Sequence, residues 1–153
     1  MTTTLKQRLH DDLTAAIKSR DELRSATIRL TLTAITKEEV AGTSARTLSD
    51  DEVLKVIARE AKKRREAAEA FAQGGRQESA DREKAEGEVL AEYLPKQLSD
   101  DELVAIVRDA IAESGADGPR AMGAVMKIVN PKVAGLAEGG RVAAEVKKQL
   151  AGG

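Results

Sequence analysis

The 153-residue chain contains no cysteine and no tryptophan, and its aromatic residues are limited to Phe71 and Tyr93. The absence of cysteine excludes disulfides, thiolate nucleophiles and sulfur-ligated metal sites. With so few aromatic rings, the core must be aliphatic, built from leucine, isoleucine, valine, alanine and methionine. A chain without cysteine fits the reducing cytosol, so we expect a cytoplasmic location.

Long apolar runs are also missing from the sequence. No run approaches the ~18 residues of a transmembrane helix, and we therefore expect no membrane partner. The amino-terminal segment is amphipathic and carries Asp11 and Asp12. It lacks the continuous apolar stretch that a secretory signal peptide requires.

The residues that are abundant indicate an all-α protein. Charged residues make up 33% of the chain, and apolar residues recur among them at helical spacing. We expect a bundle of about four helices in residues 1–94, followed by a smaller domain of short helices in residues 95–153. The expected helices span about 4–17, 23–41, 49–73, 77–94, 99–114, 119–129 and 142–150.

The pentapeptide Leu-Ser-Asp-Asp-Glu occurs twice, at residues 48–52 and 98–102. One interpretation is an internal duplication with twin acidic sites. The other is two independent capping boxes, in which a serine and a glutamate three residues later satisfy the free N–H groups at a helix start. The match fades within a few residues, and this favours the capping boxes.

Residues that could carry catalysis are scarce. His10 is the single histidine, and it lies among Arg8, Asp11 and Asp12 on a polar helix face. The chain shows no activated serine, no phosphate-binding loop ending in Gly-Lys-Ser or Gly-Lys-Thr, and no paired histidines for zinc. We expect no catalytic residues, no metal and no cofactor.

The least generic stretch is residues 119–141. Gly123 interrupts an apolar helical pattern, where glycine costs roughly 1 kcal/mol against alanine. Asn130-Pro131, Gly135 and Gly139-Gly140 follow in quick succession. These breakers predict short elements after Val129, and an interior glycine suggests close approach of a backbone or a ligand.

Charge is distributed unevenly along the C-terminal domain. Residues 95–119 hold two basic and six acidic residues, a net charge of −4, whereas residues 120–153 hold six basic and two acidic residues, a net charge of +4. The whole chain has a net charge of −1, so any nucleic-acid binding must come from such local asymmetry. The basic part overlaps the glycine-rich stretch.

We therefore predict a phosphate-binding surface, with basic side chains as contacts and glycines that permit close approach. The candidates are Arg120, Lys127, Lys132, Gly135, Gly139, Gly140, Arg141, Lys147 and Lys148. The alternative is that the basic part packs against the acidic part and is neutralised by it. No aromatic residue follows Tyr93, so bases cannot stack here, and contacts would be to the backbone of a folded tRNA rather than to a single strand or to DNA.

Two further patterns have plain structural explanations. Lys62, Lys63, Arg64 and Arg65 could form a phosphate-facing patch, but each lies near a glutamate at helical spacing. A self-paired, solvated helix face is the favoured interpretation. Met122 and Met126 could line an adaptable groove, yet their spacing is typical of core filling.

Three sequence blocks carry a family resemblance: residues 62–76 (KKRREAAEAFAQGGR), 92–103 (EYLPKQLSDDEL) and 122–142 (MGAVMKIVNPKVAGLAEGGRV). They resemble the GatB/YqeY family, and specifically its stand-alone YqeY-like proteins. The resemblance implies a helical bundle and a smaller domain similar to the tRNA-contacting tail of the amidotransferase B subunit. The family usually has a basic residue followed by Ala-Asp-Gly after the glycine of this block. Here Leu136 stands at the basic position, and Glu138-Gly139-Gly140 follows Ala137.

Three functions follow as hypotheses from the residues and the resemblance together. The first is a non-catalytic tRNA-binding or tRNA-handling accessory protein. The second is a protein–protein adaptor that docks on an amidotransferase, another translation enzyme or the ribosome. The third, suggested by the family's link to carbon–nitrogen ligases that use glutamine, is an amidotransferase acting alone, which the missing nucleophile disfavours.

Overall fold

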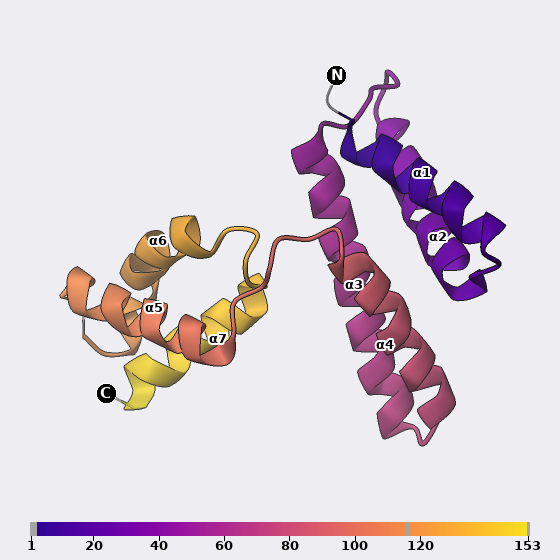
Figure 1. Cartoon of the computed structure of the whole chain (residues 1–153). Coiled ribbons are helices and arrows are strands. Elements are labelled where there is room, and N and C mark those ends of the chain that lie inside the picture. Colours follow the sequence, from indigo (N-terminus) through magenta and orange to yellow (C-terminus); the bar gives the residue numbers. More distant parts are fainter. Residues whose placement is uncertain (1–2, 116, 153) are drawn as a thin grey trace. The chain divides into compact units, whose positions relative to one another are not determined.

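The computed structural model describes residues 3–115 and 117–152, and every regular element in these residues is a helix (Figure 1). This confirms the predicted all-α class. The elements are α1 (Leu5–Lys18), α2 (Glu22–Glu39), α3 (Asp50–Gln73), α4 (Gln77–Ala91), α5 (Asp100–Ser114), the 3₁₀ helix η1 (Pro119–Ala121), α6 (Met122–Val133) and α7 (Gly139–Gly152).

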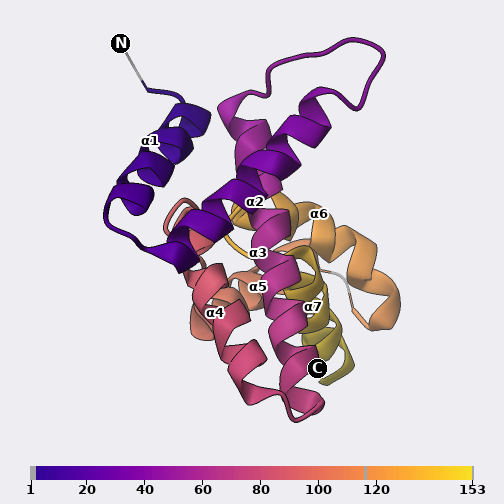
Figure 2. The ribbon, with the colours of Figure 1, turned by 90° about the vertical axis from the view of Figure 1, so that its right-hand side faces the viewer.

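The chain divides into two compact units between Leu94 and Pro95. In the first unit, α3 and α4 form a helical hairpin and run side by side in both views (Figures 1 and 2). Helices α2 and α3 each contact all three other helices of the unit. Its aliphatic core comprises Leu5, Leu9, Ile28, Ile35, Leu48, Val53, Val56, Ile57, Ala61, Val89, Leu90 and Tyr93.

The second unit contains α5, α6 and α7, which pack against one another, with η1 against α6 and α7. Valines dominate its core, which comprises Leu103, Val107, Ala110, Ala121, Val125, Val129, Val133, Val142, Val146 and Leu150. Met122 and Met126 are partly buried and pack against this cluster. Their position supports the core-filling interpretation.

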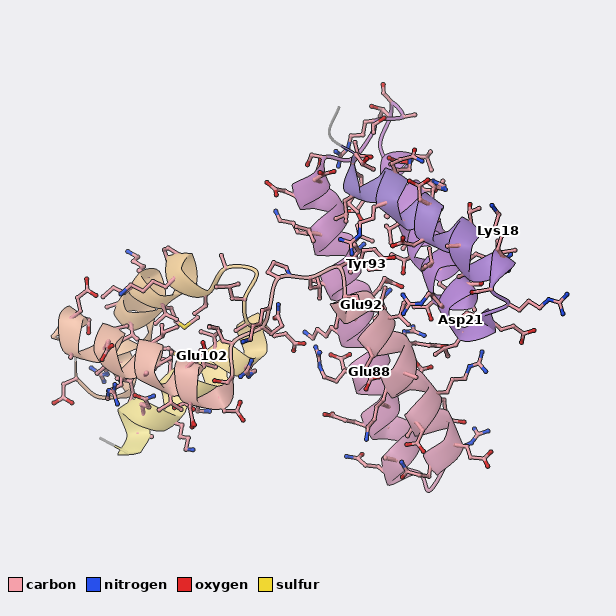
Figure 3. The ribbon with its side chains drawn as sticks, in the orientation of Figure 1. Lys18, Asp21, Glu88, Glu92, Tyr93 and Glu102 are labelled. Carbon is pink, nitrogen blue, oxygen red and sulfur yellow. The ribbon has the colours of Figure 1, made fainter. Side chains whose placement is uncertain are left out.

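Both Leu-Ser-Asp-Asp-Glu segments form complete capping boxes at the starts of α3 and α5. In each box the serine hydroxyl accepts the glutamate N–H, and the glutamate carboxylate accepts the serine N–H. The N–H of Ser49 lowers the pKa of Glu52, and the N–H of Ser99 lowers the pKa of Glu102, labelled in Figure 3. The capping interpretation of the repeat is thus confirmed.

Helix α6 departs from the prediction, because it continues through Asn130 and Pro131 to Val133 rather than stopping after Val129. Pro131 lies inside α6, in its last turn, where it has no N–H to donate and its ring crowds the carbonyl of Lys127, four residues earlier. Burial of Val133 on the face of Val125 and Val129 adds apolar packing that offsets this loss.

The loop between α2 and α3 is held by a buried carboxylate, Glu39, at the end of α2. Its Oε1 accepts a hydrogen bond from Lys6 Nζ at 2.8 Å, and its Oε2 accepts one from the N–H of Leu48 at 3.1 Å. The bond to Lys6, and then the bond to Leu48, hold the pKa of Glu39 below its ordinary value. The ionised form of Glu39 therefore stabilises the folded chain.

We expect Glu39→Gln to lower the melting temperature at pH 7. Because the pKa of Glu39 is lower in the folded chain than in the unfolded one, its contribution is full above the ordinary value and fades as the pH falls through the folded value. Thermal melts from pH 7 to pH 3 check this, with Glu88→Gln on exposed α4 surface as the control. A difference between wild type and Glu39→Gln that stays constant in acid would contradict it.

Candidate nucleic-acid interface

The six basic residues predicted as phosphate contacts all lie in the second unit. Arg120 belongs to η1, Lys127 and Lys132 to α6, and Arg141, Lys147 and Lys148 to α7. All but Arg141 are exposed to solvent. The structure divides them into two groups according to their partners.

Lys132 and Arg141 are paired with the acidic helix α5. Lys132 Nζ lies 3.3 Å from Glu113 Oε2. Arg141 NH2 lies 2.9 Å from Asp100 Oδ1 and also donates a 2.8 Å hydrogen bond to the carbonyl of Leu98. At these two positions the basic part is neutralised by the acidic part, as the alternative interpretation of the charge pattern proposed.

Arg120, Lys127, Lys147 and Lys148 form the second group. Among the residues that the structure describes, none of these four has an ion-pair partner. We call them the free cations. They retain their full charge toward solvent, so they are available to a ligand without displacing an internal carboxylate.

Two contacts show which sides of α6 and α7 face α5. On α6 that side is marked by Lys132, which pairs with Glu113, and on α7 by Gln149, which donates to the carbonyl of Val104. At 100° per residue, Lys127 lies about 140° around α6 from Lys132, and Lys147 lies about 160° around α7 from Gln149. Both lysines therefore point away from the acidic helix.

The structural requirement for glycine differs among the predicted positions. Gly135 has φ +76°, a left-handed conformation that a side chain strains. Gly139 and Gly140 begin α7, are exposed, and would meet no atom within 4 Å if they carried a Cβ. Gly123 in α6 is exposed with equally open space around it. Internal packing thus explains none of these last three.

The turn after α6 is tied to the segment that precedes α5. The N–H of Leu98 donates to the carbonyl of Leu136 at 2.8 Å, and Gln97 Nε2 donates to the carbonyl of Gly135 at 3.0 Å. Arg141 completes the connection through the Leu98 carbonyl. We call this set of bonds the clamp. It joins residues 97–100 to residues 135–141, two of the blocks that carry the family resemblance.

The sequence did not predict the clamp. The acceptors of its hydrogen bonds are backbone carbonyls, which every residue has. The identity of the side chains therefore does not reveal them. The one signal was Gly135, whose positive φ lets the chain turn so that its carbonyl meets Gln97. Leu136 takes part through its carbonyl, which accepts the N–H of Leu98, while its own N–H donates to the carbonyl of Val133 within the turn.

A second polar constellation lies in the first unit, around Tyr93, labelled in Figure 3. The Tyr93 hydroxyl donates to Asp12 Oδ2, and the Arg8 guanidinium lies 4.6 Å from the ring centroid. Burial, reinforced by Asp12, raises the pKa of Tyr93. The phenol therefore stays protonated and acts as a structural donor that joins the end of α4 to α1.

Chemistry of other kinds finds little support in residues 3–115 and 117–152. No group of three or more histidine, aspartate or glutamate side chains there is arranged to hold a metal ion. His10 is exposed on α1. Among the helices of this part of the chain, none combines the length and the apolarity that crossing a membrane requires.

A comparison with protein-family models decides the family. The model described as Yqey-like protein matches residues 6–150. The chain belongs to the Yqey-like family. The match extends from α1 nearly to the end of α7, so both units are part of the family pattern. Among the curated proteins compared with this Yqey-like chain, none matches it.

Proposed function

We propose that this Yqey-like protein is a non-catalytic accessory protein that binds tRNA through the phosphate backbone. The observation that carries the proposal is the set of free cations. Arg120, Lys127, Lys147 and Lys148 have no ion-pair partner within residues 3–115 and 117–152, and Lys127 and Lys147 point away from the acidic helix. Unpaired lysine and arginine side chains are the residues that neutralise phosphates in nucleic-acid complexes.

The chemistry of the second unit favours a folded RNA over a single strand. The unit has no aromatic side chain on which an unstacked base could lie. It has an exposed helix start at Gly139 and Gly140, where free N–H groups can approach an anion without hindrance from side chains. Such a surface reads phosphate positions and shape, which a folded tRNA supplies.

The proposal is consistent with the resemblance to the tail of the amidotransferase B subunit. In this proposal, Lys132 and Arg141 hold the second unit together, and the free cations make the phosphate contacts. The chain then delivers or orients tRNA, and any amidation chemistry takes place on another protein.

The direct test is an electrophoretic shift series of the full chain with total tRNA across salt concentrations. Four phosphate contacts predict a slope of log affinity against log salt between about −3 and −4. A single-stranded RNA of equal length serves as the control and should bind more weakly than tRNA. Equal binding of both RNAs, or a slope near zero, would overturn the proposal.

A protein–protein adaptor is the second candidate, and exposed apolar side chains in the first unit favour it. Ile17, Leu30 and Val40 are 48%, 53% and 60% exposed. An adaptor predicts no affinity for isolated tRNA at physiological salt, together with recovery of a translation protein in a pull-down. Substitution of Leu30 by serine should then abolish the recovery.

Gly123→Ala tests the tRNA proposal, because we expect it to raise the stability of the protein and to lower its affinity for tRNA. The substitution should raise the free energy of unfolding by about 1 kcal/mol, because alanine favours the helix and nothing obstructs its methyl group. Gly123 lies one turn before Lys127, so the added methyl group should also weaken tRNA binding. Urea unfolding and the shift series measure the two effects, with Gly152→Ala, near the end of α7, as the control. If the variant is more stable and binds tRNA as well as the wild type does, Gly123 is not part of the interface.

A further inference from the structure

Two carboxylates of the α3–α4 hairpin approach the same nitrogen of one guanidinium. Glu83 and Glu86 are one turn apart on α4, and their Oε2 atoms lie 3.2 Å and 3.5 Å from Arg64 NH1 on α3. The prediction that Arg64 belongs to a solvated, self-paired face is therefore wrong. Lys62 and Lys63 do pair along α3, with Glu66 and Glu60.

This cluster is largely removed from solvent. The side chains of Glu86, Glu83 and Arg64 are 8%, 17% and 24% exposed. Glu83 Oε2 is buried and has no hydrogen-bond partner, although it is near Arg64. An acceptor that is buried without a donor is costly, and a bound proton would turn it into a donor.

The charges around the pair are distributed unevenly between the interior of the hairpin and its solvent edge. On α3, Glu60 is also largely buried and pairs with Lys63 at 3.1 Å. On α4, Arg82 pairs with Glu86 at 3.4 Å, and its own side chain is 65% exposed. Inside the hairpin, the carboxylates of Glu83 and Glu86 face the guanidinium of Arg64, and Glu60 lines a small hollow beside Arg64 and Glu86. The side chains of Lys63 and Arg82 are more than half exposed.

The α2 residues that line the hollow beside this pair are uncharged. They are Thr27, Leu30 and Thr31, and the small hollow lies next to Glu86 and Arg64. The hydroxyls of Thr27 and Thr31 already donate to the carbonyls of Leu23 and Thr27 within α2. Neither hydroxyl proton is free to satisfy Glu83, so the missing donor must come from elsewhere.

We propose that Glu83 and Glu86 form a proton-binding pair, and that uptake of one proton tightens the α3–α4 hairpin. The proton resides on Glu83, whose new O–H donates to the Glu86 carboxylate. Glu86 keeps its ion pairs with Arg64 and Arg82. Proton uptake thus removes one buried negative charge and supplies the donor that the Glu83 oxygen lacks.

The electrostatics give the direction of the effect. Burial raises the pKa of Glu83, Arg64 opposes the rise, and the charge of Glu86 adds to it. The folded chain then binds more protons than the unfolded chain when the pH lies between the ordinary value of 4.5 and the raised value. The free energy of unfolding therefore gains from this pair as the pH falls through that window, opposite in sign to Glu39.

Site-resolved titration separates this pair from the other carboxylates. Carboxyl ¹³C NMR of the full chain should show Glu83 titrating above 4.5, and the exposed Glu88 serves as the internal reference (Figure 3). In Glu86→Gln the Glu83 midpoint should move, because its charged neighbour is gone. A Glu83 midpoint at or below that of Glu88 would overturn the proposal.

Hydrogen exchange tests whether proton uptake tightens the hairpin. After correction for intrinsic rates, protection in α3 and α4 should rise as the wild-type protein is acidified from pH 7 toward the ordinary glutamate value of 4.5. Glu83→Gln mimics the protonated residue, so its protection should be high already at pH 7 and independent of pH. The control Glu88→Gln should behave as wild type. Equal pH dependence in wild type and Glu83→Gln would refute the switch, and both variants are expected to fold because each removes a charge without changing side-chain size.

Discussion

Replacement of all four free cations by glutamine should reduce tRNA binding at least tenfold near physiological salt and flatten its salt dependence. Each lysine or arginine that contacts a phosphate contributes about one unit to the slope of log affinity against log salt. Removing four contacts should thus remove a slope of about four units. The substituted residues are Arg120, Lys127, Lys147 and Lys148.

A matched control comes from the first unit. Arg29, Lys37, Lys55 and Lys84 are also exposed and have no ion-pair partner in the part of the chain that the structure describes. Their joint replacement by glutamine changes the net charge equally and has the same residue composition. If this control loses affinity as much as the first variant, binding follows total charge and not the α6–α7 surface, and the proposed interface is wrong.

Arg141→Met should destabilise the second unit by about 2 kcal/mol. The substitution keeps an unbranched apolar stem and removes the guanidinium that bonds the Leu98 carbonyl and Asp100. Hydrogen bonds with a charged partner contribute about 1.5–3 kcal/mol, and one-third exposure of the Arg141 side chain places the loss toward the lower part of that range. The clamp between the turn after α6 and the start of α5 would be weakened.

Amide hydrogen exchange in α5, α6 and α7 measures the effect of Arg141→Met without requiring the two units to unfold together. Protection in α1–α4 should not change. Lys148→Met, on the exposed side of the same helix, provides the control and should leave protection unaltered. Because Arg141 is a clamp residue in our proposal, tRNA affinity measured below the unfolding transition should fall less than in the four-cation variant. A fall in tRNA affinity larger than that of the four-cation variant would indicate that Arg141 contacts phosphate.

Features that depend on interactions between residues close in sequence were predictable. The capping boxes at Ser49 and Ser99 depend on residues three positions apart, so the sequence contains all the information that they need. The helical class follows in the same way from the spacing of apolar residues within each segment. Even here a tertiary contact intervened, since burial of Val133 extended α6 through Pro131.

The division of the cations was not predictable by such means. Lys127 and Lys132 are both lysines on one short helix, yet one is free and the other pairs with Glu113, nineteen residues away in sequence. Arg64 looked like its neighbours Lys62 and Lys63, but it faces α4 and meets Glu83 and Glu86. Periodicity tells which residues share a side of a helix, and it does not tell which other helix lies there.

The sequence by itself determined the all-α class, the starts of the helices with capping boxes, the aliphatic core and the concentration of positive charge in the last third of the chain. It did not predict that α7 begins at Gly139. The tertiary structure alone decided which of those charges are neutralised, how the clamp joins two separated segments, and where two carboxylates of α4 meet the guanidinium of Arg64. The physical reason is the separation along the chain of the residues that interact. Caps and apolar stripes arise between residues within a turn or two, whereas the charge state and availability of a side chain depend on groups that only folding brings within a few ångströms.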